Sequence, residues 1–373
     1  MYGLELNTIE EIMRVNIVNY EKDSWILEKF ALKMQSELAK MEIECSIKDC
    51  VDKDADINHH LIYNNYNGVP SSHDTLMITH IDDSYKLEKA INGVKNSCMG
   101  ICMSSQMMNW LVQMGADKTK LCYVVPAHDQ VAKPRKTKIG LASRVYPDGR
   151  KNEKFLNRLA KELDPAYFRF AIMGAGWENQ VDALRAAGFE VEYDDEFIRE
   201  KYYPMIESLD YYLYMGHDEG QMGFVDAAAA GVPSIVTPQG YHLDAPAALT
   251  NPFDTYEELR DILLSIQDRR KAIVNSVADW TWKDYTIKHV EIWKHILGEE
   301  VSSLYVDGLN SNLKLKDMEI ASHVDTEEEK RKLDLLTKER RSNTRKSMIK
   351  DGSIIKAAFN KLLRIAHIKQ HND

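Results

Sequence analysis

The chain has 373 residues, of which 44% are hydrophobic and 28% charged, and a formal net charge of −10 at pH 7. This length predicts two domains, and the acidic balance argues against general nucleic-acid binding. The sequence has no run of about 18 apolar residues, so a transmembrane helix is not expected. Five cysteines without a framework spacing, and a start without a signal-peptide pattern, predict a cytoplasmic protein with reduced thiols.

Apolar, β-branched runs alternate with helical periodicity through the first 130 residues. We expect helices at residues 24–40 and 106–114, and strands at 15–18, 42–47, 60–63, 75–81, 98–103 and 121–125. This alternation is typical of right-handed βαβ units around a mostly parallel sheet. The pattern therefore predicts a first Rossmann-like domain over residues 1–130.

The alternation starts again after a polar segment at residues 127–137, which we interpret as a linker. Further strands are expected at 138–142, 168–173, 190–193 and 211–215, with helices at 152–163, 178–187 and 198–209, then a helical run after 267 and another over 285–297. These elements predict a second Rossmann-like domain over residues 131–300. The fold class is therefore α/β with two such domains.

Residues 301–373 differ in character and predict a charged helical tail. Residues 330–373 hold 13 Lys and Arg against 4 Asp and Glu, a net charge of +9, which leaves −19 for the rest of the chain. Residues 353–367 carry an apolar stripe at helical spacing, flanked by basic residues. Attachment to an anionic membrane surface, self-association or docking onto the acidic body, and a solvated helix all remain open.

The most informative segment is residues 218–236, in which an acidic, glycine-containing loop leads into a helix of small residues and then a β-branched strand. A helix N-terminus carries partial positive charge and free N–H groups, which suit an anion such as a diphosphate. Acids beside it, such as Asp218, Glu219 and Asp226, can hold sugar or ribose hydroxyls. This combination indicates a nucleotide-sugar site.

The run from Asp226 to Pro233, Asp-Ala-Ala-Ala-Ala-Gly-Val-Pro, resembles the second half of a family signature. The family is the retaining glycosyltransferases of the GT-B fold, the glycogen-synthase-like superfamily. Its signature is a Glu, seven residues, and a second Glu that opens such a helix; Asp226 stands in the second place. Asp218 has the spacing of the first acid, whereas Glu219 has its residue type and is followed by Gly220. We favour Glu219 and keep Asp218 as the alternative.

The resemblance covers roughly residues 75–298 and implies roles for further residues. The first acid would contact the donor sugar, and Asp226 the ribose. Arg144 and Lys151, in the loop after the strand at 138–142, would bind the donor diphosphate, where fixed cations stabilise the leaving group without a metal. His80 would lie near the donor sugar and acceptor, although a structural role is an equal alternative. The remaining donor-binding candidates are Gly174, Gly220, Met222 and Gly223.

The resemblance thus implies a GT-B enzyme of two Rossmann-like domains facing a cleft. We expect transfer of a sugar, with retention, from a UDP- or GDP-sugar to a glycan or lipid-linked acceptor, in a hexosyltransferase-like reaction without metal or other cofactor. The expected location is cytoplasmic, with the tail as a candidate contact to the inner face of the membrane. Two alternatives stay open: a nucleotide-sugar epimerase of the same fold, and a catalytically silent partner subunit.

Overall fold

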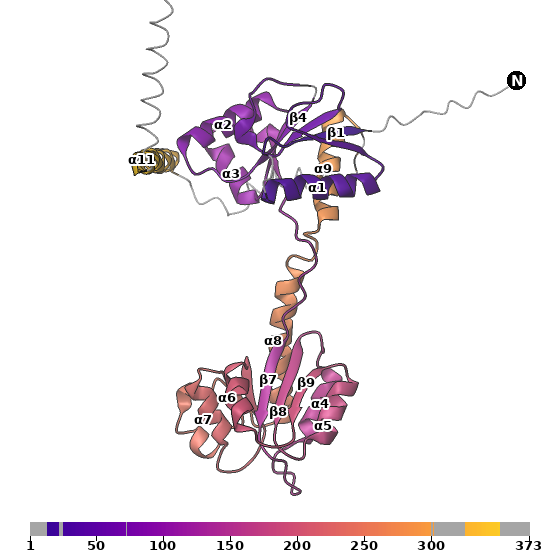
Figure 1. Ribbon diagram of the computed structural model, residues 1–373, viewed down its shortest axis with the longest axis vertical. Helices are drawn as coiled ribbons and strands as arrows, with labels where there is room; N and C mark the ends of the chain where they lie inside the picture. The colour runs from indigo at the N-terminus through magenta and orange to yellow at the C-terminus, as the bar shows by residue number, and fades with distance from the viewer. Residues whose placement is uncertain (1–12, 22–24, 72, 300, 302–324, 351–373) are drawn as a thin grey trace, which may run out of the picture. The chain divides into compact units, whose positions relative to one another are not determined.

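The structure is a computed structural model that describes residues 13–21, 25–71, 73–299, 301 and 325–350, with side chains to residue 344. The chain divides into two compact units (Figure 1). The first unit combines residues 1–129 with residues 280–373, and the second is residues 130–279. Each unit is described by itself below.

Among its described residues, the first unit contains a six-stranded parallel sheet in the order β2-β1-β3-β4-β5-β6. Its strands are β1 (Arg14–Val18), β2 (Glu44–Lys48), β3 (Ile57–His60), β4 (Asp74–Ile78), β5 (Met99–Cys102) and β6 (Leu121–Tyr123). Its helices are α1 (Trp25–Lys40), α2 (Ser84–Asn96), α3 (Ser105–Gln113), α9 (Trp282–Leu297) and α11 (Thr326–Lys350).

Alternate residues of the strands feed two separate cores, one on each face of this sheet. Met77 packs in the core that α1 and α9 cover, whereas its neighbours Leu76 and Ile78 pack in the core that α2 and α3 cover. This division follows from the period of two along a strand. It explains why the strands read as continuous apolar runs, as strands buried on both faces do.

The second unit has, in the part of the chain described, a six-stranded parallel sheet in the order β12-β11-β10-β7-β8-β9. Its strands are β7 (Thr137–Ala142), β8 (Phe168–Met173), β9 (Glu190–Asp194), β10 (Tyr211–Tyr214), β11 (Ser234–Val236) and β12 (Asn251–Pro252). Its helices are α4 (Lys154–Glu162), α5 (Glu178–Ala186), α6 (Arg199–Glu207), α7 (Met222–Ala229) and α8 (Tyr256–Asn275).

The helices of the second unit also divide between two faces. α4, α5 and α8 cover one core, and α6 and α7 cover the other. Two parallel sheets, each covered by helices on both faces, confirm the predicted α/β class with two Rossmann-like domains, the architecture of the GT-B fold.

The predicted second boundary, at residue 300, is wrong because α9 belongs to the first unit. Trp282 packs edge-on to Phe30 of α1, with ring centroids 4.9 Å apart. Trp293 is fully buried and its Nε1 donates to Thr75 Oγ1 of β4 at 3.2 Å. The chain therefore returns to the first sheet to bury the aromatic face of α9, which reading the elements in chain order did not anticipate.

Part of the tail docks on the first unit as helix α11. Leu333 is buried in the core that α2 covers, and Thr337 Oγ1 accepts a hydrogen bond from the Ser84 backbone N–H at 3.1 Å. Arg340 Nη2 lies 2.6 Å from Asp82 Oδ2. Of the three interpretations of the tail, these contacts favour docking onto the acidic body. The apolar stripe at 353–367 lies outside the described residues.

No helix in the described part of the chain is both long enough and apolar enough to cross a membrane.

Candidate functional site

The second sheet changes direction between β7 and β10. From β7 the chain moves outward through β8 and β9, and then returns to β10 on the other side of β7. The loops that follow these two strands therefore diverge, leaving a crevice at the carboxyl ends of the strands, where open α/β sheets bind ligands. Residues 143–153 and 215–221 form the two loops, and they hold half of the predicted site residues.

Lys151 joins the two loops through a buried ion pair. Its Nζ donates to Asp218 Oδ2 at 2.7 Å and to Tyr214 Oη at 2.6 Å, and its side chain is only 6% exposed. Tyr214 Oη in turn donates to Asp218 Oδ1 at 2.7 Å. Partial burial alone would raise the pKa of Asp218, but the hydrogen bonds from Lys151 and Tyr214 lower it overall. Lys151 and Tyr214 therefore hold the Asp218 carboxylate in place.

The structure separates the two candidates for the first acid. Besides its bonds to Lys151 and Tyr214, the Asp218 carboxylate accepts from the Gly220 backbone N–H at 3.2 Å. Glu219 is exposed, and among the described residues its carboxylate makes no hydrogen bond or ion pair. Gly220, at φ +109°, lies against the Tyr241 ring and turns the chain after the acids. Asp218 thus holds the lysine, while Glu219 is available to a ligand.

Helix α7 begins without a side-chain cap at its first turn. The side chain of its N-cap residue, Gln221, donates to the Ala142 carbonyl instead. The Gln221 backbone N–H donates to His242 Nε2 at 2.9 Å, so His242 carries its proton on Nδ1, which donates to the Thr237 carbonyl at 2.9 Å. The Phe224 N–H donates to the Gln221 carbonyl at 2.9 Å. Among the described residues, the N–H groups of Met222 and Gly223 before it have no intrahelical partner and can meet an anion.

A pocket of about 450 Å³ opens beside this helix start, between the ends of β7, β8 and β9 and the first turns of α6 and α7. Arg144 is exposed and lies in its wall. Asp226, one turn into α7, accepts a hydrogen bond from Tyr202 Oη at 2.7 Å through Oδ2. The residues that line the pocket are Ala142, Ser143, Arg144, Met173, Gly174, Ala175, Asp195, Glu196, Phe197, Tyr202, Tyr203, Gln221, Met222, Gly223 and Asp226.

Two predicted glycines in this wall are required by close packing. Gly174 has φ +128°, and a Cβ there would lie 2.2 Å from the Ser143 carbonyl oxygen. A Cβ on Gly223 would lie 2.3 Å from Tyr212 Oη. Both glycines allow the backbone to come close to a neighbouring element, and they bring the turn after β8 and the start of α7 to the same pocket.

The structure thus brings Arg144, Gly174, Met222, Gly223 and Asp226 together in one pocket. The loops beside it carry the remaining predicted residues of the second unit, which are Lys151, Asp218, Glu219 and Gly220.

His80 belongs to the first unit, in the segment after β4. Its side chain is 73% exposed, and its Nε2 lies 3.1 Å from Lys86 Nζ and 3.7 Å from Asp82 Oδ2.

The sequence prediction missed the wall supplied by the β9–α6 turn: Asp195, Glu196, Phe197, Tyr202 and Tyr203. A signal was present, because three acids in succession, residues 194–196, follow a predicted strand. Side chains at the carboxyl end of a parallel strand are candidates for ligand binding. Tyr202 and Tyr203 are on α6, and only the packing of that helix brings them to the pocket.

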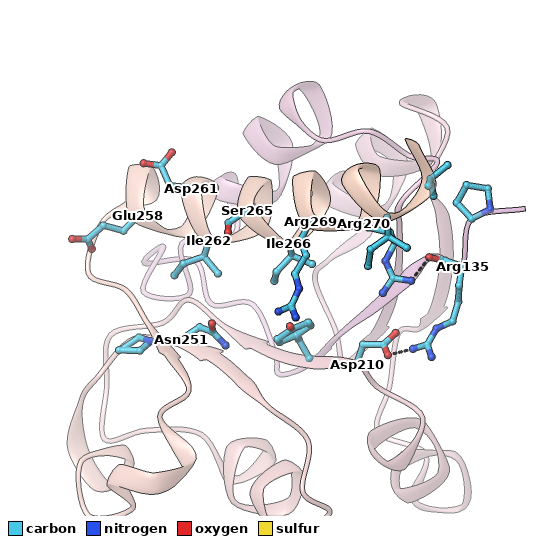
Figure 2. A pocket seen from close by; sticks show the side chains of 15 residues that line it. Arg135, Asp210, Asn251, Glu258, Asp261, Ile262, Ser265, Ile266, Arg269 and Arg270 are labelled. Carbon is cyan, nitrogen blue, oxygen red and sulfur yellow. Dashed lines mark hydrogen bonds and ion pairs between the residues drawn. The ribbon is translucent and has the colours of Figure 1, made fainter. Parts of the chain in front are cut away.

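A larger cavity of about 990 Å³ lies elsewhere in the second unit, under α8 and toward the amino ends of β7 and β10. Figure 2 shows Ile262, Ile266 and Arg269 of α8 above Asn251. At one end Arg135 is paired with Asp210. No predicted site residue lines this cavity, so size alone does not identify the functional site.

The described residues contain no group of three or more His, Cys, Asp or Glu side chains arranged to hold a metal ion.

No protein-family model matches the chain, and no curated protein matches it. Solved structures similar to it include the lipopolysaccharide outer core galactosyltransferase WaaB in its apo form, at 12% identity over 74% of this chain and 97% of that chain, with a TM-score of 0.30. Another is HepE from Anabaena in complex with UDP and glucose, at 12% identity, 75% and 99% coverage, and a TM-score of 0.30.

A third is a glycosyltransferase from Rickettsia africae, at 13% identity over 78% of this chain and all of that chain, with a TM-score of 0.31. Likenesses at these scores carry no argument about the site or the activity. The resemblance to GT-B glycosyltransferases is confirmed at the level of the fold, by the two Rossmann-like units themselves.

Proposed function

We propose that the protein is a glycosyltransferase whose nucleotide-sugar donor binds the second unit. One observation carries the proposal: a single pocket at the turning point of the sheet joins the exposed guanidinium of Arg144 to a helix start without a side-chain cap and to a carboxylate, Asp226. A diphosphate suits the first two groups, and a ribose hydroxyl suits the third. The same arrangement in a protein that binds only a simple anion would have no use for the acid.

In this reaction the bond between the sugar and the diphosphate breaks, and negative charge accumulates on the departing nucleoside diphosphate. Arg144 and the first N–H groups of α7 would stabilise that charge from fixed positions. Lys151 Nζ donates two of its three N–H groups to Asp218 and Tyr214, so one N–H would remain for a phosphate oxygen. Asp218 would act as a positioning residue, because it orients the ammonium group.

The two remaining acids would hold the sugar and the ribose. Glu219, whose side chain is exposed, would accept hydrogen bonds from hydroxyls of the donor sugar. Asp226 uses Oδ2 for Tyr202 and would offer Oδ1 to a ribose hydroxyl. By the resemblance stated above, transfer would proceed with retention, with a hexose as the donor sugar and without a metal ion. A glycan or lipid-linked acceptor would bind the first unit near His80.

The direct test is sugar transfer or donor hydrolysis by the purified full-length chain over a panel of nucleotide sugars. Arg144→Ala and Glu219→Gln should each lower the rate at least about a hundredfold, the usual cost of removing one transition-state contact. Arg199→Ala and Glu207→Gln are matched controls, because both side chains are exposed and lie outside the pocket. Unchanged rates in both site variants would refute the assignment.

The same assay separates the finer parts of the proposal. The anomeric proton coupling of the product reports retention, and an unchanged rate in excess chelator reports independence from metal. Conversion of the donor sugar to its epimer without an acceptor would indicate an epimerase. Saturable donor binding without turnover across the panel would indicate a silent partner subunit.

The proposal also gives a role to the tail. Residues after 350 would bring the enzyme to an anionic membrane surface, or to a second copy of itself, through the basic, apolar-striped segment at 353–367. Co-sedimentation with vesicles containing anionic lipid should fall when residues 351–373 are removed, and sedimentation velocity on the two forms reports self-association. Equal behaviour of both forms in both measurements would remove this part of the proposal.

A further inference from the structure

The pocket of the second unit has a wall for which the proposed chemistry gives no role. It comes from the turn after β9 and the adjoining part of α6, and it includes two exposed aromatic side chains. Phe197 is 63% exposed and Tyr203 is 49% exposed. Large aromatic rings left open to solvent inside a ligand pocket offer faces on which a planar ring can stack.

The aromatic groups of this wall are connected to Asp226 through Tyr202. Tyr202 donates to Asp226, and the Tyr202 ring contacts those of Phe197 and Tyr203, with centroids 5.0 and 5.1 Å away. Glu196 directly precedes Phe197 in the chain and also lines the pocket. A ligand held by Asp226 therefore has aromatic rings and carboxylates in the same pocket wall.

The two carboxylates of the wall are available to a ligand. Within the described residues, Asp195 and Glu196 are exposed and make no hydrogen bond or ion pair, whereas the adjacent Asp194 is held by Lys201 at 2.5 Å. An ionised carboxylate can only accept hydrogen bonds. The ligand atoms that face this end of the pocket must consequently be N–H or O–H donors.

We infer that the pocket selects guanine, so that the donor is a GDP-sugar; this inference rests on the proposed function. With the ribose at Asp226 and the base on Phe197 or Tyr203, the edge of the base faces Asp195 and Glu196. Guanine presents two adjacent donors, N1–H and N2–H, which one carboxylate can accept together. Uracil presents a single N–H between two carbonyl oxygens, which a carboxylate repels. Adenine and cytosine place a ring-nitrogen acceptor beside their amino group, which is equally unfavourable.

The test is titration calorimetry of the full-length protein with GDP, UDP, ADP and CDP. GDP should bind at least about tenfold more tightly than UDP, because a carboxylate accepts from the two adjacent guanine donors but repels the carbonyl oxygens of uracil. Asp195→Asn and Glu196→Gln, singly or together, should reduce that ratio about tenfold, the effect of losing a charged hydrogen bond. Asp182→Asn on α5 and Glu200→Gln on α6 are matched controls, because both carboxylates are exposed and lie outside the pocket.

The aromatic part of the wall has its own prediction. Phe197→Ala and Tyr203→Ala should weaken all four nucleotides by a similar factor, about tenfold, because stacking does not distinguish the bases. Far-UV circular dichroism checks that each variant is folded, and all four substitutions are at exposed positions.

The outcomes distinguish this inference from the proposed function. Tighter binding of UDP than of GDP would overturn the choice of guanine and leave the glycosyltransferase proposal intact. A GDP preference that persists in the double acid variant would overturn the role of the two carboxylates. If the folded protein bound none of the four nucleotides, both the inference and the proposed function would fail.

Discussion

Helix α9, with which the chain returns to the first unit, carries a buried histidine. This histidine predicts that the free energy of unfolding falls in acid. His289 is fully buried and its Nδ1 donates to the Tyr285 carbonyl at 2.8 Å, while its Nε2 has no partner among the described atoms. The ring packs against Trp293 and His59. Burial lowers the pKa of His289 to about 4, from an ordinary value of 6.5, although the bond to Tyr285 opposes the shift.

The sign of the effect follows from proton uptake. The folded-state pKa lies below the unfolded one, so the unfolded chain binds a proton first as the pH falls through 6.5. Stability is therefore complete above pH 6.5 and is lost progressively down to about pH 4. At pH 5 the loss due to His289 is (6.5 − 5) × 1.36, or about 2 kcal/mol, relative to neutral pH. Burial also lowers the pKa of His59, which adds a loss of the same sign.

His289→Gln should remove this term, because a Gln amide does not titrate and can still donate to the Tyr285 carbonyl. The measurement is urea unfolding at pH 7.5 and pH 5, followed by tryptophan fluorescence, to which the buried Trp282 and Trp293 of α9 contribute. The difference in unfolding free energy between the two pH values should be smaller in the variant by about 2 kcal/mol. His295→Gln on the exposed side of α9 should leave the difference unchanged. An equal loss of stability on acidification in wild type and His289→Gln would refute the reasoning.

Two further substitutions test close packing and the docked tail. Gly223→Ala should destabilise the second unit by about 1–3 kcal/mol in thermal unfolding, because the new methyl meets the Tyr212 ring. Gly231→Ala, where an added Cβ has nothing within 4 Å, should cost only the strain of its φ of +72°, about 1 kcal/mol. Arg340→Ala removes the ion pairs of α11 with the segment after β4 and should speed hydrogen exchange in α11, whereas Arg341→Ala should not.

The sequence predicts those elements whose signal is local. The strand at 168–173 is found residue for residue as β8, because a buried parallel strand bounded by polar residues is one apolar run. Helix α2 was not predicted, although Asp83 caps it through the Lys86 N–H and Leu87, Ala90 and Val94 mark its buried face. The expected strand at 60–63 is displaced by three residues, since β3 ends at His60.

The features that could not be predicted from the sequence depend on contacts between segments that lie far apart in the chain. Trp282 and Phe30 lie far apart in the chain and meet only in the folded first unit. The acids after β10 were predicted, because strand ends and a small-residue helix are visible locally. The sequence did not predict which of Asp218 and Glu219 pairs with Lys151, because that depends on which carboxylate the buried lysine reaches in the folded chain.

Asp226 stands where the signature that this chain resembles has its second Glu. The hydrogen bond from Tyr202 offers a physical reason why the shorter acid can serve at this position. A carboxylate one methylene shorter than Glu reaches less far and would keep more rotational freedom in an open pocket. The hydrogen bond from Tyr202, at 2.7 Å, holds Oδ2 and fixes the plane of the group. In the proposed function, Oδ1 would then offer a ribose hydroxyl an acceptor of fixed orientation. Tyr202 is 5% exposed and itself packs on the aromatic wall, so any ligand placed on that wall lies beside the acid. Asp226 and the aromatic side chains of α6 are thus linked, and we propose that the β9–α6 turn, rather than the acidic loop, distinguishes the nucleotide.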